Sequence, residues 1–341
     1  MSLRGLVVTA VAVTAVATLV GSSDASVSVG RSDPAAVELV RRAVVAETAG
    51  SYSGTEVLSD QQRTPSVERL DVTHLAAQGT VLVEPAAGGQ PARSAFAPSG
   101  QQSPQLLVEL LTSSYALVLG GRSSIAGRPA RIVEALRADG SAAGRFWFDA
   151  ATGLMLRRDV LDASGTPVRS VWFTQLQMAA AAPSHLPPIA TAATGLGVNN
   201  SLLEQWRRRG WAAATSLAGM RLFDVREVAG TGDPVLHLSY SDGLSTASVF
   251  VQVGVLDTAA FDGIPGDARA VIGGQPVRVR TGQPNELTWT AGDHVITVVT
   301  DAPQQTVAAL VDDLPHSSDP GVWDRLWRGL SRVGSWLNPF D

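Results

Sequence analysis

Three aspartates lie close together in the middle of the chain, and their spacing is the first feature that suggests chemistry. Asp159 and Asp162 are near enough in sequence to form a carboxylate pair, which general acid–base catalysis often uses. The stretch also has the composition of turns, because Asp149 precedes Gly153 and Asp162 precedes Gly165. Aspartate accepts backbone hydrogen bonds in turns, and glycine permits positive φ. The turn interpretation explains aspartate and glycine together, so we predict corners of an antiparallel ribbon.

Other catalytic patterns are missing from the sequence. It contains no G-x-S-x-G elbow, no Walker A loop, no H-E-x-x-H and no G-x-G-x-x-G after a predicted strand. The histidines have no metal-ligand spacing between any two of them; they are His74, His185, His237, His294 and His316. We therefore predict a protein that is not an enzyme and needs no cofactor. A Ser/His/Asp triad scattered along the chain stays open, which keeps a hydrolase as a third hypothesis.

Composition limits the class of protein further. The chain has 341 residues, of which 45% are hydrophobic, and this length allows two domains with large cores. It has no cysteine, which excludes disulfides, thiolate metal sites and a cysteine nucleophile. The formal net charge of -5 argues against nucleic acid as a partner, since affinity for phosphate requires a cationic surface.

The beginning of the chain has the layout of an export signal. Arg4 is followed by an apolar stretch from Leu6 to Val20, and small residues at Ser23 and Ala25 fit a cleavage site. This apolar stretch is shorter than the roughly 20 residues that span a bilayer comfortably. We expect a signal peptide over residues 1–25, with an uncleaved anchor as the alternative, and an exported, extracytoplasmic protein in both cases.

Periodicity predicts an N-terminal domain over residues 34–178. A helix is expected after Asp33, with Pro34 in its first turn, and several strands should follow from Tyr52. Residues 85–105 are rich in Pro, Gly, Gln and Ser and are interpreted as a long exposed loop, followed by a short helix. From Tyr115 a series of strands with regularly spaced turns indicates an antiparallel meander.

The strands of this meander are apolar on both faces, which is typical of a sheet that other elements cover. Counting alternate positions along each strand places one set of apolar side chains on the inner face. Its predicted residues are Phe146, Phe148, Leu154, Leu156, Val171 and Phe173.

A linker and a second domain follow. Residues 179–200 have small residues and prolines without periodicity, and residues 201–316 contain a helical start, strands and a closing helix. In the helical start, Arg207, Arg208 and Arg209 form either a solvated face or a contact for an acidic partner or a lipid phosphate.

The last segment, residues 319–341, predicts an amphipathic helix with an apolar stripe that includes Trp323 and Trp327. This helix would pack on its own domain, bind a partner, or contact a membrane surface, and Trp336 would take part in the last two cases.

Three blocks of sequence resemble the RseB/MucB family of extracytoplasmic regulators of envelope-stress sigma factors. SYSGTEVLSD followed by VERLDVTHLA is similar to the family's opening strands, and Thr73-His74 matches a Thr-His pair there. The second block runs from IAGRPARIVEALRADG through GRFWFDAATGLMLRRDVLDASG to VRSVWFTQLQM. The third is LHLSYSDGLSTASVFVQ, with the matching run at residues 240–244. Residues 85–105 and the Trp-rich tail have no counterpart in this pattern.

The resemblance implies an α+β protein. Its N-terminal domain would be an unclosed antiparallel β half-barrel with helices on its open side, similar in shape to the LolA lipoprotein carriers. A smaller C-terminal domain with an antiparallel sheet would follow. The implied function is to bind the extracytoplasmic segment of a membrane anti-sigma factor, protect it from proteolysis, and release it when a lipid-like ligand binds. The resemblance also implies that this ligand enters the apolar half-barrel, so the inner face predicted above would line a lipid cavity. A cell-envelope carrier of lipids or lipoproteins is the alternative.

Overall fold

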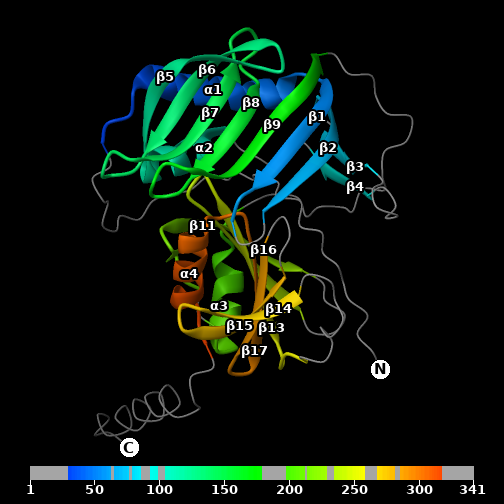
Figure 1. Cartoon of the computed structure of the whole chain (residues 1–341). Coiled ribbons are helices and arrows are strands. Elements are labelled where there is room, and N and C mark those ends of the chain that lie inside the picture. Colours follow the sequence, from blue (N-terminus) through cyan, green and yellow to red (C-terminus); the bar gives the residue numbers. More distant parts are fainter. Residues whose placement is uncertain are drawn as a thin grey trace, which may run out of the picture.

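The structure is a computed structural model of the whole chain (Figure 1). It describes residues 30–62, 65–76, 79–85, 93–98, 104–178, 197–211, 213–228, 234–257, 267–280 and 285–316. The predicted signal segment, most of the predicted linker and the Trp-rich tail lie outside these residues. In the described part of the chain, no helix has the length and hydrophobicity needed to cross a membrane.

The N-terminal domain is built on a nine-stranded antiparallel sheet, in the order β4-β3-β2-β1-β9-β8-β7-β6-β5. The first strand pairs with the last, and β4 and β5 remain as edges, so the strongly curved sheet is an unclosed half-barrel (Figure 1). The strands are β1 (Tyr52–Asp60), β2 (Ser66–Leu75), β3 (Gly79–Glu84), β4 (Arg93–Pro98), β5 (Ala116–Ile125), β6 (Arg128–Leu136), β7 (Ala142–Asp149), β8 (Met155–Leu161) and β9 (Pro167–Met178).

Strand β4 corrects one expectation, because it lies inside the segment that the sequence predicted to be a loop. It pairs with β3 from Gly79↔Pro98 to Glu84↔Arg93. Its backbone hydrogen bonds come from a neighbouring strand, and Pro98 lies at the strand end, where a missing N–H is tolerated. The Pro- and Gly-rich flanks conceal such a short edge strand when only local composition is considered.

Two helices cover one face of this sheet (Figure 1). Helix α1 (Pro34–Ala49) begins where predicted, with the Asp33 carboxylate accepting a 2.8 Å hydrogen bond from the Ala35 amide. Helix α2 (Pro104–Ser114) packs on α1 and β5. Both helices bury small or branched aliphatic side chains against the strands, among them Ala36, Val40, Val108 and Leu111.

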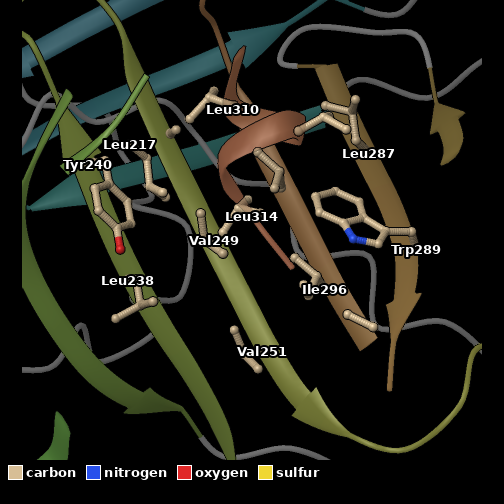
Figure 2. Close-up of a cluster of buried hydrophobic side chains, with 14 of the residues drawn as sticks. Leu217, Leu238, Tyr240, Val249, Val251, Leu287, Trp289, Ile296, Leu310 and Leu314 are labelled. Carbon is tan, nitrogen blue, oxygen red and sulfur yellow. The ribbon is translucent and has the colours of Figure 1, made fainter. Parts of the chain in front are cut away.

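The C-terminal domain has an eight-stranded antiparallel sheet in the order β10-β11-β12-β13-β17-β16-β15-β14. Helices α3 (Asn200–Arg208) and α4 (Gln304–Asp313) accompany it. The strands are β10 (Ser216–Leu217), β11 (Met220–Val228), β12 (Val235–Ser241), β13 (Thr246–Val253), β14 (Asp267–Ile272), β15 (Gln275–Arg280), β16 (Asn285–Ala291) and β17 (His294–Thr300). Leu238, Val251, Trp289 and Leu310 belong to its large buried core (Figure 2).

The turn chemistry predicted from the sequence is confirmed at the β7–β8 and β8–β9 corners. The Gly153 amide donates to the Asp149 carbonyl over 2.8 Å, and the Gly165 amide donates to the Asp162 carbonyl over 3.1 Å. Both glycines have φ near +80°, a conformation that side-chain-bearing residues rarely adopt. The regular strands between the corners therefore follow from local sequence.

Gly54 should be needed where β1 meets β9. A Cβ atom at this position would lie 2.2 Å from the Gln175 carbonyl oxygen, beside the bulge in the β1–β9 register. We expect Gly54→Ala to lower the free energy of unfolding by about 1–3 kcal/mol, because backbone must shift to relieve the clash. Urea unfolding at equilibrium measures this loss.

The matched control is Gly121→Ala, since a Cβ atom there would meet nothing within 4 Å. The free energy of unfolding of this variant should stay within about 0.5 kcal/mol of the wild-type value. Equal stability of the two variants would contradict the close approach at Gly54.

Candidate binding site

The aspartates of the meander are held as acceptors by their own turns. The buried Asp149 carboxylate receives hydrogen bonds from Arg128 at 2.7 and 3.1 Å and from the Thr152 amide and hydroxyl. Burial alone would raise the pKa of Asp149, but these hydrogen bonds and the Arg128 charge lower it below its ordinary value. Hydrogen bonds from Ser164 and Thr166 lower the pKa of Asp162 in the same way. Neither carboxyl is poised for proton transfer near neutral pH.

Asp159 is held by an arginine on the same strand. Its two carboxylate oxygens each accept a 2.8 Å hydrogen bond from Arg157. The Arg157 guanidinium also stands over the rings of Trp147 and Trp172, 4.8 and 5.7 Å from their centroids. Asp159 therefore orients a stacked arginine, and the suspected carboxylate pair with Asp162 has a structural explanation for each member.

Three of the described histidines have separate local contacts. His74 forms a hydrogen bond with the Thr80 hydroxyl and stacks on Tyr52. His294 contacts the Asp293 carboxylate, and His316 stacks on Trp289. His185 is outside the described residues.

His237 has the arrangement closest to a catalytic dyad, with its Nε2 atom 3.3 Å from the Ser239 hydroxyl. Burial lowers the pKa of His237 to about 4, and the positive charge of Arg226 contributes to this shift. In a Ser-His-Asp triad a carboxylate orients the imidazole and stabilises its protonated form, whereas the charge of Arg226 disfavours the protonated form of His237. No metal-ligand cluster of three or more His, Asp or Glu residues occurs in the part of the chain that the structure describes.

Five of the six predicted cavity residues fall into three hydrophobic clusters. Phe146 and Phe148 stack with centroids 5.9 Å apart and pack with α1 and α2; we call this group the helix-side cluster. Leu154 and Phe173 pack with Tyr52 and Val72 in a second group, the β1–β2 cluster.

Leu156 packs instead with Trp147 and Ala130, and Val171 is half-buried outside the three groups. The β7–β8 register shifts at a bulge between Trp147 and Phe148. Because a bulge interrupts the alternation of side chains between the two faces, alternate positions of β8 do not all lie on the same face. The binding of a lipid by these residues stays a prediction.

Glu56 is a candidate that the sequence analysis missed. It pairs across the sheet with Leu70 and Phe173, so its side chain shares the face of the β1–β2 cluster. Burial raises the pKa of Glu56 to about 7, and the negative charge of Glu47 adds to the shift. A protonated, neutral carboxyl on an apolar face can donate a hydrogen bond to a ligand, and its charge would change near physiological pH.

The two domains meet through the loop between β12 and β13, which is the second feature that the sequence analysis missed. The Tyr115 hydroxyl donates a 2.6 Å hydrogen bond to the Asp242 carboxylate, across 127 residues of chain. The other carboxylate oxygen accepts from the amides of Leu244 and Ser245, at 2.8 and 2.7 Å. Burial raises the pKa of Asp242, while these hydrogen bonds oppose the shift.

Further contacts surround this junction. Arg158 donates to the Leu244 carbonyl and lies 3.3 Å from the Asp301 carboxylate. The Gln62 side chain also reaches the Ala302 carbonyl over 3.4 Å. The run at residues 240–244 was part of the family resemblance, but nothing local in it indicated that its partners lie in the other domain.

The predicted arginine contacts lie on the exposed end of α3. Arg207 pairs with Glu204 at 2.8 Å, and Arg209 lies 3.8 Å from Glu227 with its guanidinium over Trp206. Arg208 is exposed. The other predicted contact residues, Trp323, Trp327 and Trp336, are outside the described residues.

The class of protein is thus a two-domain α+β protein: a helix-covered β half-barrel joined to a smaller antiparallel-sheet domain. The family model of the MucB/RseB N-terminal domain matches residues 84–190, and that of the MucB/RseB C-terminal domain matches residues 205–315. Together the two matches cover more than half of the sequence, and the chain belongs to the MucB/RseB family.

Individual relatives agree with this assignment. The sigma factor AlgU regulatory protein MucB of Pseudomonas aeruginosa is 30% identical over 200 residues, which are 58% of this chain and 59% of that protein. The crystal structure of MucB is similar with a TM-score of 0.52, and that of MucB in complex with MucA(peri) with 0.51. Each is 23% identical and covers 83% of this chain, with 98% and 100% of the respective MucB chain matched. These likenesses confirm the fold.

The raised pKa of Glu56 predicts a particular pH dependence of stability. In the unfolded chain the Glu56 carboxyl loses its proton near pH 4.5, the ordinary pKa of glutamate. In the folded protein it keeps the proton until about pH 7. Stability should therefore fall as the pH rises between these values. Glu56→Gln removes this titrating group. The free energy of unfolding of the variant should therefore exceed that of the wild type by an amount that grows from pH 5 to pH 8 and reaches about 1–3 kcal/mol. Urea unfolding at both pH values measures the difference.

Glu38→Gln serves as the control, because Glu38 is exposed and forms only a surface pair with Arg41. Its effect should be small at both pH values. A Glu56→Gln variant whose stability runs parallel to the wild type from pH 5 to pH 8 would show that Glu56 titrates normally.

Proposed function

We propose that this protein is a non-catalytic, extracytoplasmic regulator that binds a membrane anti-sigma factor and protects it from proteolysis. The observation that carries the proposal is the match of both MucB/RseB domains, in order, over the half-barrel and the second sheet. A relative is named as a regulatory protein of the sigma factor AlgU, and a solved structure of similar fold contains MucB with MucA(peri). The export signal expected over residues 1–25 supports the location outside the cytoplasm.

A lipid-like ligand is the proposed signal for release of the partner. The helix-side and β1–β2 clusters offer the apolar contacts that an acyl chain requires, with Phe148 and Phe173 among them. Glu56 would place one titrating carboxyl beside these contacts. The ligand's entry would be coupled to the partner through the junction between the domains.

The partner-contact residues are also a proposal. The Arg207–Arg209 run at the end of α3 would meet acidic groups of the anti-sigma factor or lipid phosphates, since guanidinium groups pair well with both. The Trp-rich segment 319–341 would contact the partner or a membrane surface.

A carrier of lipids or lipoproteins is the second candidate function, and the same apolar clusters favour it. Native mass spectrometry of protein purified without detergent separates the two functions. Lipid that co-purifies stoichiometrically supports a carrier, while protein without lipid that binds an anti-sigma factor supports a regulator.

The regulator hypothesis predicts a direct complex. The full-length mature protein should bind the extracytoplasmic segment of an anti-sigma factor from the same cell, with a dissociation constant of about 1 μM or lower. Calorimetric titration measures this affinity, and the segment in the complex should resist a protease that cleaves it when free.

An unrelated extracytoplasmic peptide of equal length and charge is the control. Absence of a complex with every anti-sigma segment of that cell, while the protein is folded, would remove the regulatory function.

Arg208 tests the proposed contact on α3. Reversing its charge with Arg208→Glu should weaken the complex about threefold, and more strongly at low salt, if the arginine run meets acidic groups of the partner. The matched control is Arg269→Glu, an equal charge change at an exposed position of β14. Unchanged affinity of the Arg208 variant would assign the arginine run to a solvated helix face.

A further inference from the structure

Leu244 belongs to the C-terminal domain by sequence, but its side chain lies in the core of the N-terminal domain. Only 2% of it is exposed, and it packs in the helix-side cluster with residues such as Val108, Leu111 and Phe146. The other buried members of that cluster come from α1, α2 and strands β5 to β7. A leucine from a distant loop therefore completes a hydrophobic core that is otherwise local.

Two glycines make this insertion possible. A Cβ atom on Gly243, whose φ is +87°, would lie 2.7 Å from the Leu111 amide nitrogen and 3.0 Å from its Cα atom. A Cβ atom on Gly144 of β7 would lie 2.6 Å from the Leu244 side chain. The loop and the half-barrel thus approach each other more closely than side chains would allow on either side.

The polar atoms of the loop hold the leucine in this position. The Asp242 carboxylate accepts hydrogen bonds from the amides of Leu244 and Ser245 and from the Tyr115 hydroxyl. Arg158 donates a hydrogen bond to the Leu244 carbonyl. The C-terminal domain therefore presents one apolar side chain on a rigid, hydrogen-bonded loop. Tyr115, which follows α2 directly, itself packs against the helix-side cluster.

We propose that the loop of residues 241–245 is a built-in plug: Leu244 occupies the position in the helix-side cluster that an acyl chain would fill. A leucine side chain and a few methylene groups have the same apolar chemistry and similar volume, and a close-packed interior has no room for both. Entry of an acyl chain then expels Leu244 and undocks the C-terminal domain. This inference rests on the proposed function, because it gives the lipid-like ligand a physical route to the bound partner.

The first measurement is the affinity for cis-parinaric acid, an acyl chain whose fluorescence rises in apolar surroundings. Wild-type protein must expel the leucine before the probe binds, whereas Leu244→Ala has already vacated the position. We expect this variant to bind the probe about tenfold more tightly, because the wild type loses the burial of one leucine side chain.

Two further variants test the interpretation. Gly243→Ala displaces the loop without shortening Leu244, and it should also increase the affinity for the probe. Leu238→Ala removes an equally buried leucine from β12, in the core of the C-terminal domain, and should leave the affinity unchanged (Figure 2).

The second measurement is the distance between the domains. The chain has no cysteine, so Val67→Cys and Val271→Cys place spin labels at two exposed positions, one in each domain, without other labelled sites. Electron-spin distance measurements should give one narrow distribution for the free protein. The probe should broaden or shift it, as should Leu244→Ala without probe.

The outcomes separate the plug from the proposed function. Equal probe affinity of wild type and Leu244→Ala, with an unchanged distance distribution, overturns the plug and leaves lipid binding intact. If neither protein binds the probe, the lipid-sensing part of the proposed function fails and the plug fails with it. Tighter binding by both loop variants, together with a probe-induced change of distance, supports the plug.

Discussion

Burial of Leu244 is the interaction on which the arrangement of the molecule depends. The helices α1 and α2 cover one face of the half-barrel, and a leucine from the other domain completes the cluster beneath them. Because the core of the N-terminal domain includes a residue of the C-terminal domain, the packing of this core is coupled to the position of the C-terminal domain. Any event that repacks the helix-side cluster must therefore act on the domain junction, since close-packed cores respond to single methylene groups.

The polar contacts around that leucine give the junction its geometry. The Asp242 carboxylate organises its own loop through two backbone amides and joins the other domain through the Tyr115 hydroxyl. Arg158 links the same loop to Asp301 at the start of the segment before α4. Hydrogen bonds provide direction where the hydrophobic contact provides most of the free energy. Together these contacts hold the two domains in one relative orientation.

Local sequence predicted the features that have local causes. The Asp–Gly corners, the Asp33 cap and the antiparallel meander all depend on residues a few positions apart, and they agree with the structure. The β4 segment was predicted to be a loop, Leu156 was assigned to the face of Phe146 but packs with Trp147, and the raised pKa of Glu56 was missed. Each of these features depends on a strand pairing or a bulge that joins distant segments. The junction was the hardest to foresee, since Asp242 and Tyr115 meet only when both domains are folded. Family resemblance marked the residues of that loop without explaining them.

Hydrogen exchange of the β12–β13 loop measures whether Leu244 docks the two domains, because the loop would be an exposed hairpin tip if the domains were not docked. The amides of Gly243, Leu244 and Ser245 donate to side chains of the same loop, beneath a buried leucine. If the two domains are docked through Leu244, these amides should exchange in the free protein as slowly as those of the neighbouring strands β12 and β13. Exchange at the rate of a solvent-exposed turn would contradict this docking, and with it the view that the two domains share one core.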